Sequence, residues 1–520
     1  MNMPVDKPSK KAPLLQPTNT TRPRIYWMNK MRTKREDGSP VELVPTPEQL
    51  AVAFAKCSRS STPFDQNVDD VDLEKAAAFH EKWVVGYGHG SVAEHAVASV
   101  AMENIPQVVV KIVEDSRLCS YTEKSSRYQV FTRDRVAVPT TLEKSPYMSE
   151  VNQLFDRLYG LYDECYELLE PLMNERNPQG DLSDGAYKAV LKALVCDRVR
   201  YLLPSASLTM VGMTANARNW GFAITKLLST DDSIAQDVGN QIKDSLRGKV
   251  GTDPDEALQK FPLPTLLKYA DPNPYQIEMP KTMAKLTGLI LDSENITDGK
   301  SDKRVICTYD DVNAELRIAA SLLSLHGKIN MAQALDILAH KPEMINILIA
   351  EAMKDRGAHD PAPRAFEHAW FQHQIVMDYG GWRDIQRHRM CTQSNQPLGT
   401  DLGYDIPVEI EEIGKEKDFA AVMDMARDLN HKLLDAGMAT EAEYVVPMAY
   451  RRRLVVSWNV RELFHFIELR SGKKGHPSYR KVAQDLWHSL NEAHPLIASY
   501  IRVDLSETGI STLGEKPKGF

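Results

Sequence analysis

The sequence lacks most of the features that assign a chain to a common class of enzyme. Its 520 residues contain only six cysteines, which form no Cys-x-x-Cys pair and show no His–Cys spacing of a zinc site. No Gly-x-Ser-x-Gly elbow and no His-Glu-x-x-His motif occurs either. We therefore expect no bound metal and reduced, mostly buried thiols, and find little support for a hydrolase.

A membrane span and a basic surface are missing as well. No apolar run reaches the length that crosses a bilayer, and the opening MNMPVDKPSKKAPLLQ lacks the hydrophobic core of a signal peptide. The net charge is −8 and the pI is near 6.0, whereas general nucleic-acid binders are usually basic. We expect a cytoplasmic protein with no membrane partner and no nucleic-acid partner.

What the chain does contain is amphipathic helices and fewer strands. With 42% hydrophobic residues it can bury sizeable cores in two or more domains. Apolar periodicity predicts helices over 72–90, 149–175 and 418–438, and strands over 96–105, 107–114 and 373–379. The pattern favours an α+β fold.

The composition divides the chain into four segments. Residues 1–40 are rich in Pro, Lys, Thr and Asn, which predicts a flexible N-terminal arm. A stretch dense in Pro and Asp, with a polar loop after it, predicts a linker over 251–305. The segments that remain, 41–250 and 306–520, are the two expected domains.

These two domains share motifs in the same order. GSVAEHAVASVAMEN in the first corresponds to APRAFEHAWFQHQIVM in the second, and DSRLCSYTEKSSRY corresponds to RHRMCTQSNQPLGT. Pro204 lies twelve positions before Asn216, and Pro447 lies twelve positions before Asn459. Both asparagines begin an Asn-x-Arg triplet. We infer a tandem duplication.

Several fixed features of the motifs are arginines, namely Arg127, Arg200, Arg387, Arg389 and Arg470. A guanidinium binds a phosphate or a pyrimidine carbonyl through two parallel hydrogen bonds and keeps its charge. A set that converges on one pocket would suit a nucleotide monophosphate. The alternative is that they are surface arginines or ion-pair partners in a chain with 71 acidic residues.

Other polar groups also allow two interpretations. GYGHGS, from Gly86 to Ser91, is either a helix-capping turn or a loop whose amides approach a phosphate. The pair Glu94–His95 is explained most simply as two satisfied helix residues. His388 stands between two arginines, and burial beside cations lowers a histidine's pKa, so this arrangement favours an anion site.

In these motifs the sequence resembles the flavin-dependent thymidylate synthases. That family has a His-Gly-Ser-like segment followed by Glu-His, an Arg-His-Arg motif, a Ser-Tyr-x-Glu-x-Ser-x-Arg-Tyr segment, an Arg-x3-Pro and a C-terminal Asn-x-Arg motif. The resemblance covers about 45–250 and 310–490. It implies two tandem copies of a central β-sheet flanked by long helices, and sites for FAD and dUMP that neighbouring subunits of a tetramer build jointly.

The resemblance also implies a role for individual residues. As catalytic groups it implies Arg387, Arg470 and Ser125. Substrate-binding residues would be Glu123, Ser125, Arg127, Arg200, Arg387 and Arg470. Cofactor-binding residues would be His89, Ser91, Glu123, Asn216, Arg387, His388, Arg389, Asn459 and His465. Cys391, two positions after Arg389, is expected to be a small core residue.

Each half departs from the family pattern at different positions. In the first, Arg-His-Arg has become Asp115-Ser116-Arg117, and the last arginine of the C-terminal motif is replaced near Leu227. In the second, the Ser-x-Arg segment has become Pro397-Leu398-Gly399 and Glu443 stands where the nucleotide-binding arginine is expected.

Two further positions of the second half differ, since the flavin-binding histidine position falls near Ala362 and Asp384 stands where the family usually has glutamine. Between them the halves retain nearly one full set. We therefore expect composite sites, with Glu123, Ser125, Arg127 and Arg200 from the first half and Arg387 to Arg389 with Arg470 from the second. A homodimer of tandem chains would mimic the tetramer, with two competent and two dead sites.

The activity that follows from the resemblance is the reductive methylation of dUMP to dTMP, with methylenetetrahydrofolate as the one-carbon donor and NADPH reducing FAD. Arginines holding the nucleotide would stabilise negative charge that develops on the uracil ring. Two alternatives stay open. The acceptor is another pyrimidine nucleotide, or the chain is a non-catalytic relative that binds a nucleotide or acts as a scaffold.

Overall fold

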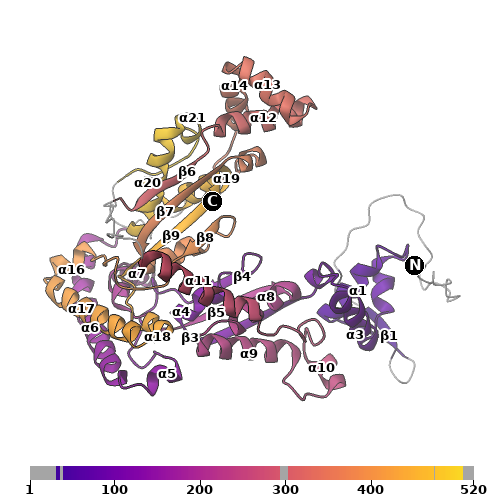
Figure 1. Ribbon diagram of the computed structural model, residues 1–520, viewed down its shortest axis with the longest axis horizontal. Helices are drawn as coiled ribbons and strands as arrows, with labels where there is room; N and C mark the ends of the chain where they lie inside the picture. The colour runs from indigo at the N-terminus through magenta and orange to yellow at the C-terminus, as the bar shows by residue number, and fades with distance from the viewer. Residues whose placement is uncertain (1–27, 29–30, 35–38, 293–302, 474, 507–520) are drawn as a thin grey trace. The chain divides into compact units, whose positions relative to one another are not determined.

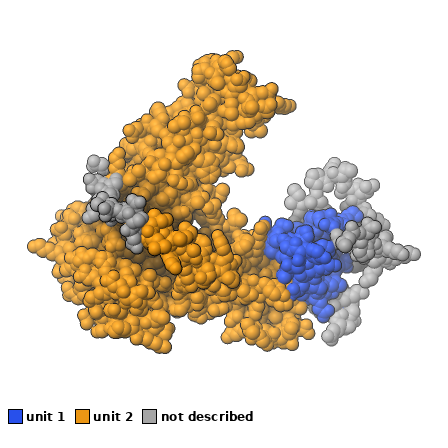
Figure 2. Space-filling model, viewed as in Figure 1, with its two compact units in different colours: residues 1–96 blue, residues 97–520 orange. Residues whose placement is uncertain are grey.

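The computed structural model describes residues 28, 31–34, 39–292, 303–473 and 475–506. The chain divides into two compact units, residues 1–96 and 97–520, which Figure 2 shows in different colours. Most of the expected N-terminal arm and the polar loop at 293–302 lie outside the described residues. No helix within the described part is both long and apolar enough to cross a membrane.

The first unit joins a hairpin to a small group of helices. The hairpin pairs β1 (Met31–Lys34) with β2 (Pro40–Leu43), so part of the segment expected as a flexible arm is ordered. Its helices are α1 (Pro47–Lys56), α2 (Phe64–Asp69), α3 (Leu73–Phe79), the π-helix η1 (His80–Gly86) and the 3₁₀ helix η2 (Val92–His95). Thr46 and Gln49 form a capping box that fixes the start of α1.

The second unit contains one antiparallel sheet from each half of the chain (Figure 1). The first has the order β3-β5-β4, with β3 (Val97–Pro106), β4 (Ser120–Glu123) and β5 (Leu208–Asn216). The other has the order β6-β7-β9-β8, with β6 (Val305–Asp310), β7 (Trp370–Asp378), β8 (Thr392–Asn395) and β9 (Arg451–Asn459). Except for β6, the strand orders match.

The registers of the two sheets match as well. Asn216 pairs with Val97 at the start of β3, and Asn459 pairs with Trp370 at the start of β7. Each asparagine then caps the next helix, because its side chain accepts a hydrogen bond from the third residue of that helix. The helices are α8 (Ala217–Leu228) and α19 (Val460–Arg470). The duplication inferred from the sequence is therefore present in the fold.

The remaining helices complete this unit. In and after the first repeat they are α4 (Gln107–Val113), α5 (Thr140–Glu143), α6 (Met148–Arg176), α7 (Asp184–Val199), η3 (Arg200–Leu202), α9 (Ser233–Arg247), α10 (Pro254–Lys260) and α11 (Pro274–Asp292). In the second repeat they are α12 (Ala314–Gly327), α13 (Met331–His340), α14 (Glu343–Met353), η4 (Arg364–His368), α15 (Tyr379–Gln386), α16 (Val408–Glu412), α17 (Glu416–Asp435), α18 (Ala439–Tyr444), α20 (Pro477–Ala493) and α21 (Pro495–Ala498).

Equivalent segments of the two repeats pair with each other. Pro204 forms an antiparallel bridge with Pro447, the proline at the same place in the other repeat. The Ser205 amide donates to the Val446 carbonyl at 3.0 Å, and the Met448 amide donates to the Leu203 carbonyl at 2.9 Å. The long helices α6 and α17 also pack together. A local two-fold relation between the repeats brings equivalent residues together in this way.

One expectation about secondary structure was wrong. The run QVVVKIVE, predicted as a strand, is the helix α4, and it follows directly after Pro106 ends β3. A short apolar run buried on several sides has no periodicity that separates strand from helix. The segment predicted as a linker, 251–305, contains the helix α10 and the 19-residue α11. Four of the six cysteines are buried, among them Cys391, and all six are free.

Candidate functional site

The site begins at the end of β4, where Glu123 meets two arginines of the second repeat. Arg383 and Arg387 lie one helical turn apart at the end of α15, so they face the same side. The Arg383 Nη2 is in an ion pair with Glu123 Oε1, and the Arg387 Nη2 lies 3.4 Å from Glu123 Oε2. The Glu123 side chain is 1% exposed, which makes this carboxylate a buried junction between the repeats.

Asp384 carries a second carboxylate into the same region. Its Oδ1 lies 3.8 Å from Arg387 Nη1 and 3.9 Å from Arg470 Nη1. Burial by itself raises the pKa of Asp384, but Arg200, Arg387, Arg470 and Arg127 around it hold that pKa below its usual value. Four arginines from both repeats therefore lie near enough to one carboxylate to lower its pKa, and two of them, Arg387 and Arg470, lie within 4 Å of it.

Arg200 is the most buried of these arginines. It is 2% exposed, and its Nε and Nη2 atoms have no hydrogen-bond partner among the described residues. A buried guanidinium with unsatisfied N–H groups is costly for a folded protein unless a ligand completes it. Neither alternative, a surface arginine or an ion-pair partner at hydrogen-bond distance, describes Arg200.

Tyr479 connects arginines of the two repeats. Arg127 donates to both oxygens of Asp197 at 2.7 and 2.8 Å, and its Nη1 donates to the Tyr479 hydroxyl at 3.2 Å. The guanidinium of Arg470 lies over the ring of the same tyrosine, 5.3 Å from its centroid. Arg127 is therefore both an ion-pair partner and a member of the converging set.

His388 is held neutral by its neighbours. Arg470 Nε donates to His388 Nε2 at 2.9 Å, so the proton of the ring lies on Nδ1, which contacts Glu462 Oε1 at 3.1 Å. Burial lowers the pKa of His388, and Arg470 lowers it further, against the opposing effect of Glu462. The sequence suggested such a shift from its two flanking arginines; the cation responsible is Arg470.

A cavity of about 260 Å³ opens beside Glu123. It is lined by Glu114, Tyr121, Thr122, Glu123, Gln386, Arg387 and Arg389. The pKa of Glu114 is raised to about 7, mainly by burial and also by the nearby Glu123, against the opposing effect of Arg387 and Arg383. The Arg389 guanidinium lies 5.8 Å from the centroid of the Tyr121 ring.

This donor set fits part of a flavin dinucleotide. Two guanidinium groups next to an aromatic ring suit a planar, hydrogen-bonding ring or an anionic phosphate. The volume lies below the range of about 300–1,000 Å³ typical of small-molecule pockets, so this cavity has room for only one portion of such a ligand.

Other expected cofactor residues lie elsewhere. Asn459 and His465 line a separate cavity of about 540 Å³ that also includes Ala362 and Arg461. The His465 ring lies 5.4 Å from that of His388. Asn216 and Asn459 both serve as helix caps, a role that the sequence motifs do not indicate.

His89 and Ser91 belong to the first unit and are described within it. The His89 ring lies 5.9 Å from the Trp83 ring, and Gly88 has a φ of +74°, which agrees with the expected unusual backbone of this turn. Ser91 precedes η2, but its side chain makes no capping hydrogen bond, which does not support the helix-capping alternative for this turn. Ser125 accepts a hydrogen bond from the Arg127 amide at 3.2 Å.

Exchanging the roles of the two repeats defines a second position equivalent to the arginine cluster. Contacts within the protein fill this second position. Arg383 lies six residues before Arg389, and Lys111 lies six residues before the matched Arg117. In the same way, Arg200 and Glu443 each lie four residues before one of the matched prolines. Lys111 Nζ forms an ion pair with Glu443 Oε2 at 2.7 Å, and the Leu398 amide donates to the same oxygen at 3.2 Å. An internal ion pair therefore stands where the first pairing gathers its arginines.

The sequence motifs missed several members of the cluster, namely Arg383, Glu114, Asp197, Tyr479 and Glu462. One signal was available for Arg383, because it lies four residues before Arg387, a spacing that places both on one face if the segment is helical, as α15 is. The remaining partners come from elements far apart in the sequence, and no spacing links them.

Comparison with known proteins gives the chain a family. The family model described as thymidylate synthase complementing protein, Thy1, matches residues 41–236 and 313–496. The chain belongs to the Thy1 family. The match occurs once in each repeat, as a tandem duplication requires, and the fold is α+β in both.

Among curated Thy1 relatives, a UPF0159 protein of Chlamydia muridarum is 30% identical over 474 residues, 86% of this chain and 85% of that protein. A flavin-dependent thymidylate synthase of Clostridium tetani is 22% identical over 178 residues, 34% of this chain and 68% of that enzyme. The crystal structure of ThyX from Helicobacter pylori in complex with FAD and dUMP is 20% identical and covers 38% of this chain and 100% of its own, with a TM-score of 0.30.

Proposed function

We propose that the chain is a flavin-dependent thymidylate synthase that methylates dUMP, using methylenetetrahydrofolate and NADPH, at one composite site per chain. The observation that carries the proposal is the convergence of Arg127 and Arg200 from one repeat with Arg387 and Arg470 from the other. Neither repeat supplies this set by itself. Relatives within the same family include flavin-dependent thymidylate synthases.

In this proposal the arginines bind and orient the nucleotide. Arg200, whose Nε and Nη2 find no partner in the described protein, donates to the anionic part of the nucleotide. Arg470 and Arg387 flank Asp384 at 3.9 and 3.8 Å and stabilise negative charge on the uracil ring. Ser125 is the third catalytic group that the family pattern implies. Because these cations are held before substrate binds, little reorganisation is needed during the reaction.

FAD, when bound, supplies the redox chemistry that links NADPH to the one-carbon unit. Arg387, Arg389 and the Tyr121 ring would hold one portion of it beside Glu123. His388 is a neutral imidazole whose Nε2 accepts from Arg470, so in this proposal it positions Arg470. The proposal assigns further cofactor contacts to His89, Ser91, Asn216, Asn459 and His465.

Asp384 favours a second candidate within the same chemistry. A carboxylate beside Arg200 and Arg470 cancels part of the positive charge that would attract a phosphate. An acceptor that carries less negative charge than dUMP near these groups, such as another pyrimidine nucleotide bound in a different pose, fits this balance. Replacement of Asp384 by asparagine distinguishes the two acceptors.

We also propose that the chain forms a homodimer. Along α11, Tyr275, Met279, Met283, Leu286 and Ile290 recur at intervals of three or four residues, and all five side chains are exposed. A contiguous apolar stripe of this length is unusual on a free surface. In a dimer with two-fold symmetry, the same stripe of a second copy of the chain would cover this stripe.

The visible absorption spectrum of the purified protein tests the function. We expect flavin bands that shift when dUMP is added, because the nucleotide then lies against the isoalloxazine ring. Flavin bands without a shift would favour another acceptor. A colourless protein that takes up no added FAD would favour a non-catalytic binding or scaffold role and overturn the proposal.

A further inference from the structure

His494 lies between two carboxylates where three elements of the second repeat meet. It stands between α20 and α21. Its Nδ1 lies 2.7 Å from Glu315 Oε2 in the first turn of α12, and its Nε2 lies 2.7 Å from Asp310 Oδ1 at the end of β6. The His494 side chain is 4% exposed, so water takes little part in these contacts.

The two contacts together require an additional proton. A neutral imidazole has a proton on one nitrogen and a lone pair on the other. In that form, one nitrogen of His494 would direct its lone pair at a carboxylate oxygen 2.7 Å away, and the two would repel. The imidazolium is the form that donates to both carboxylates. Burial lowers the pKa of His494, but Glu315 and Asp310 together raise it above its usual value.

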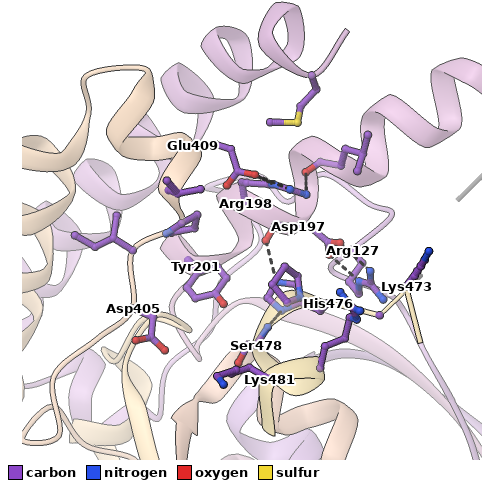
Figure 3. Close-up of a pocket in the computed structure, with 18 of the residues that line it drawn as sticks. Arg127, Asp197, Arg198, Tyr201, Asp405, Glu409, Lys473, His476, Ser478 and Lys481 are labelled. Carbon is purple, nitrogen blue, oxygen red and sulfur yellow. Dashed lines mark hydrogen bonds and ion pairs between the residues drawn. The ribbon is translucent and has the colours of Figure 1, made fainter. Parts of the chain in front are cut away.

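His476 shows how a buried histidine behaves without carboxylates at both nitrogens. Its ring contacts the Ser478 amide at 3.3 Å and the Asp197 carbonyl at 3.4 Å, as Figure 3 shows. Both are uncharged backbone groups, and burial lowers the pKa of His476 well below its usual value. His476 therefore stays neutral, whereas His494 is arranged to hold a second proton.

The side chains around His494 leave it as the group whose charge changes near neutral pH. The Phe371 ring of β7 meets the imidazole edge-on at 5.1 Å and is uncharged. The other titratable or charged side chains next to this joint are His373 of β7, Asp311 and Arg317 at the turn from β6 to α12, and the exposed Glu492 of α20. Burial lowers the pKa of His373 to about 4, so it stays neutral. Asp311 and Arg317 pair with each other at 3.0 Å.

The strand β6 has few other contacts that would hold its second half. It is an edge strand that pairs only with β7, and a bulge between Cys307 and Tyr309 interrupts that pairing. None of its six residues is fully buried. It lies beside α20 (Figure 1), but a cavity of about 380 Å³ separates part of the strand from the last turns of that helix. An edge strand of this kind can leave its sheet while the other strands stay paired.

The first half of β6 is held differently. Arg304, directly before the strand, pairs with Asp405 through two hydrogen bonds of 2.8 Å. A guanidinium keeps its charge over the whole neutral range, so this contact does not respond to pH. The two ends of the strand therefore differ in how they depend on protons.

We propose that His494 is a pH-sensitive latch, which as an imidazolium holds the turn from β6 to α12 against the end of α20 and on losing its proton releases the second half of β6. Deprotonation leaves one of the two carboxylates without its donor. Because the pKa is raised in the folded chain, the latch contributes fully below about pH 6.5, and its contribution is lost as the pH rises through the higher folded value.

Hydrogen exchange of the full-length chain, followed by mass spectrometry at a series of values from about pH 6 to about pH 9, tests the latch. After correction for the intrinsic exchange rate at each pH, we expect the protection of residues 307–313 to fall at least about fivefold across the series. The protection of the central strand β9 should stay within about twofold, since its pairing does not depend on His494. A His494→Gln variant has no proton to lose, so its protection over 307–313 should not depend on pH.

A second variant tests the latch without removing the histidine. Glu315→Gln leaves His494 with one carboxylate, so the fall in protection should occur at lower pH than in the natural chain. The matched control is His340→Gln, because His340 pairs with Asp336 on the exposed surface of α13, and this variant should behave like the natural chain.

Three results would overturn the latch. They are protection over 307–313 that is the same across the series in the natural chain, a pH dependence that survives in folded His494→Gln, and a midpoint in Glu315→Gln that is not lower. An equal fall in β9 would also overturn it, because the opening would then be global rather than confined to β6.

Discussion

Glu123 and Arg383 form a buried ion pair, although the two residues lie 260 positions apart in the chain. Each belongs to a different repeat, and each is nearly inaccessible to solvent. The pair ties the end of β4 to α15 and fixes Arg387 on the next turn. The candidate site is therefore also a structural junction of the duplicated halves.

Breaking this junction should cost stability. Arg383→Met leaves Glu123 buried with only the more distant Arg387, and removal of one partner of a buried pair costs about 3–5 kcal/mol. Urea unfolding followed by circular dichroism measures the loss. Lys260→Met, which breaks an exposed pair, should change the free energy of unfolding by less than about 1 kcal/mol. Equal effects of the two substitutions would mean that the junction carries no special stability.

Replacing Asp384 should strengthen nucleotide binding. Asp384→Asn keeps the size of the side chain but removes the negative charge that faces Arg387 and Arg470. We expect dUMP to bind at least about tenfold more tightly, which corresponds to roughly 1.4 kcal/mol. Fluorescence titration of the bound flavin with dUMP gives the affinity. Asp336→Asn, which changes an exposed side chain of α13, is the control. Weaker binding in the Asp384 variant would instead support an acceptor that contacts this carboxylate directly.

Glu114 should make the stability depend on pH. Its pKa is raised from 4.5 to about 7 in the folded state, so the folded chain keeps a proton that the unfolded chain loses. Its contribution to stability is thus fully present below about pH 4.5 and is lost as the pH rises through about 7, by up to about 3 kcal/mol. Glu114→Gln should therefore be more stable than the natural chain at pH 8 and no more stable at pH 4.5. Parallel unfolding curves at the two pH values decide this, and a constant difference would contradict the shift.

The ion pair between Lys111 and Glu443 should contribute to stability and not to nucleotide binding. Lys111→Met breaks the ion pair with Glu443 and should lower the free energy of unfolding by about 1–3 kcal/mol. The affinity for dUMP should remain within twofold of the natural value, because the arginines of the open position are untouched. A loss of dUMP binding in a folded Lys111→Met protein would show that both positions take part in binding.

The stripe on α11 should control assembly. Leu286→Lys with Ile290→Lys places two charges in the proposed contact and should shift the dimer to monomer. Light scattering after size-exclusion chromatography measures the mass. Leu434→Lys, at an isolated exposed leucine of α17, should leave the mass unchanged. A variant that stays dimeric would place the interface on another surface.

The sequence predicted the repeats and the longest helices well, because those depend on local periodicity and on motifs that recur. The helices α6 and α17 and the strand β7 lie where apolar spacing placed them. The helix α4 was mistaken for a strand because burial, rather than periodicity, decides its form.

Within the candidate site, the family motifs pointed to Arg127, Arg200 and Arg470 but could not show that all three act on the pKa of Asp384. Arg383 received no role, since its partner Glu123 lies in the other repeat and pairing over such a distance leaves no local signal. Tyr479 was missed for the same reason. The two asparagines were assigned only to the cofactor, although each also caps a helix.

The central claim is that each chain has one nucleotide site, built from both repeats. Titration of dUMP into the FAD-saturated protein, with the flavin spectrum as readout, counts the sites directly. We predict one dUMP per chain, and none when Arg200→Gln in the first repeat or Arg470→Gln in the second is introduced singly. Two dUMP molecules per chain, or full binding in either folded variant, would contradict the composite site.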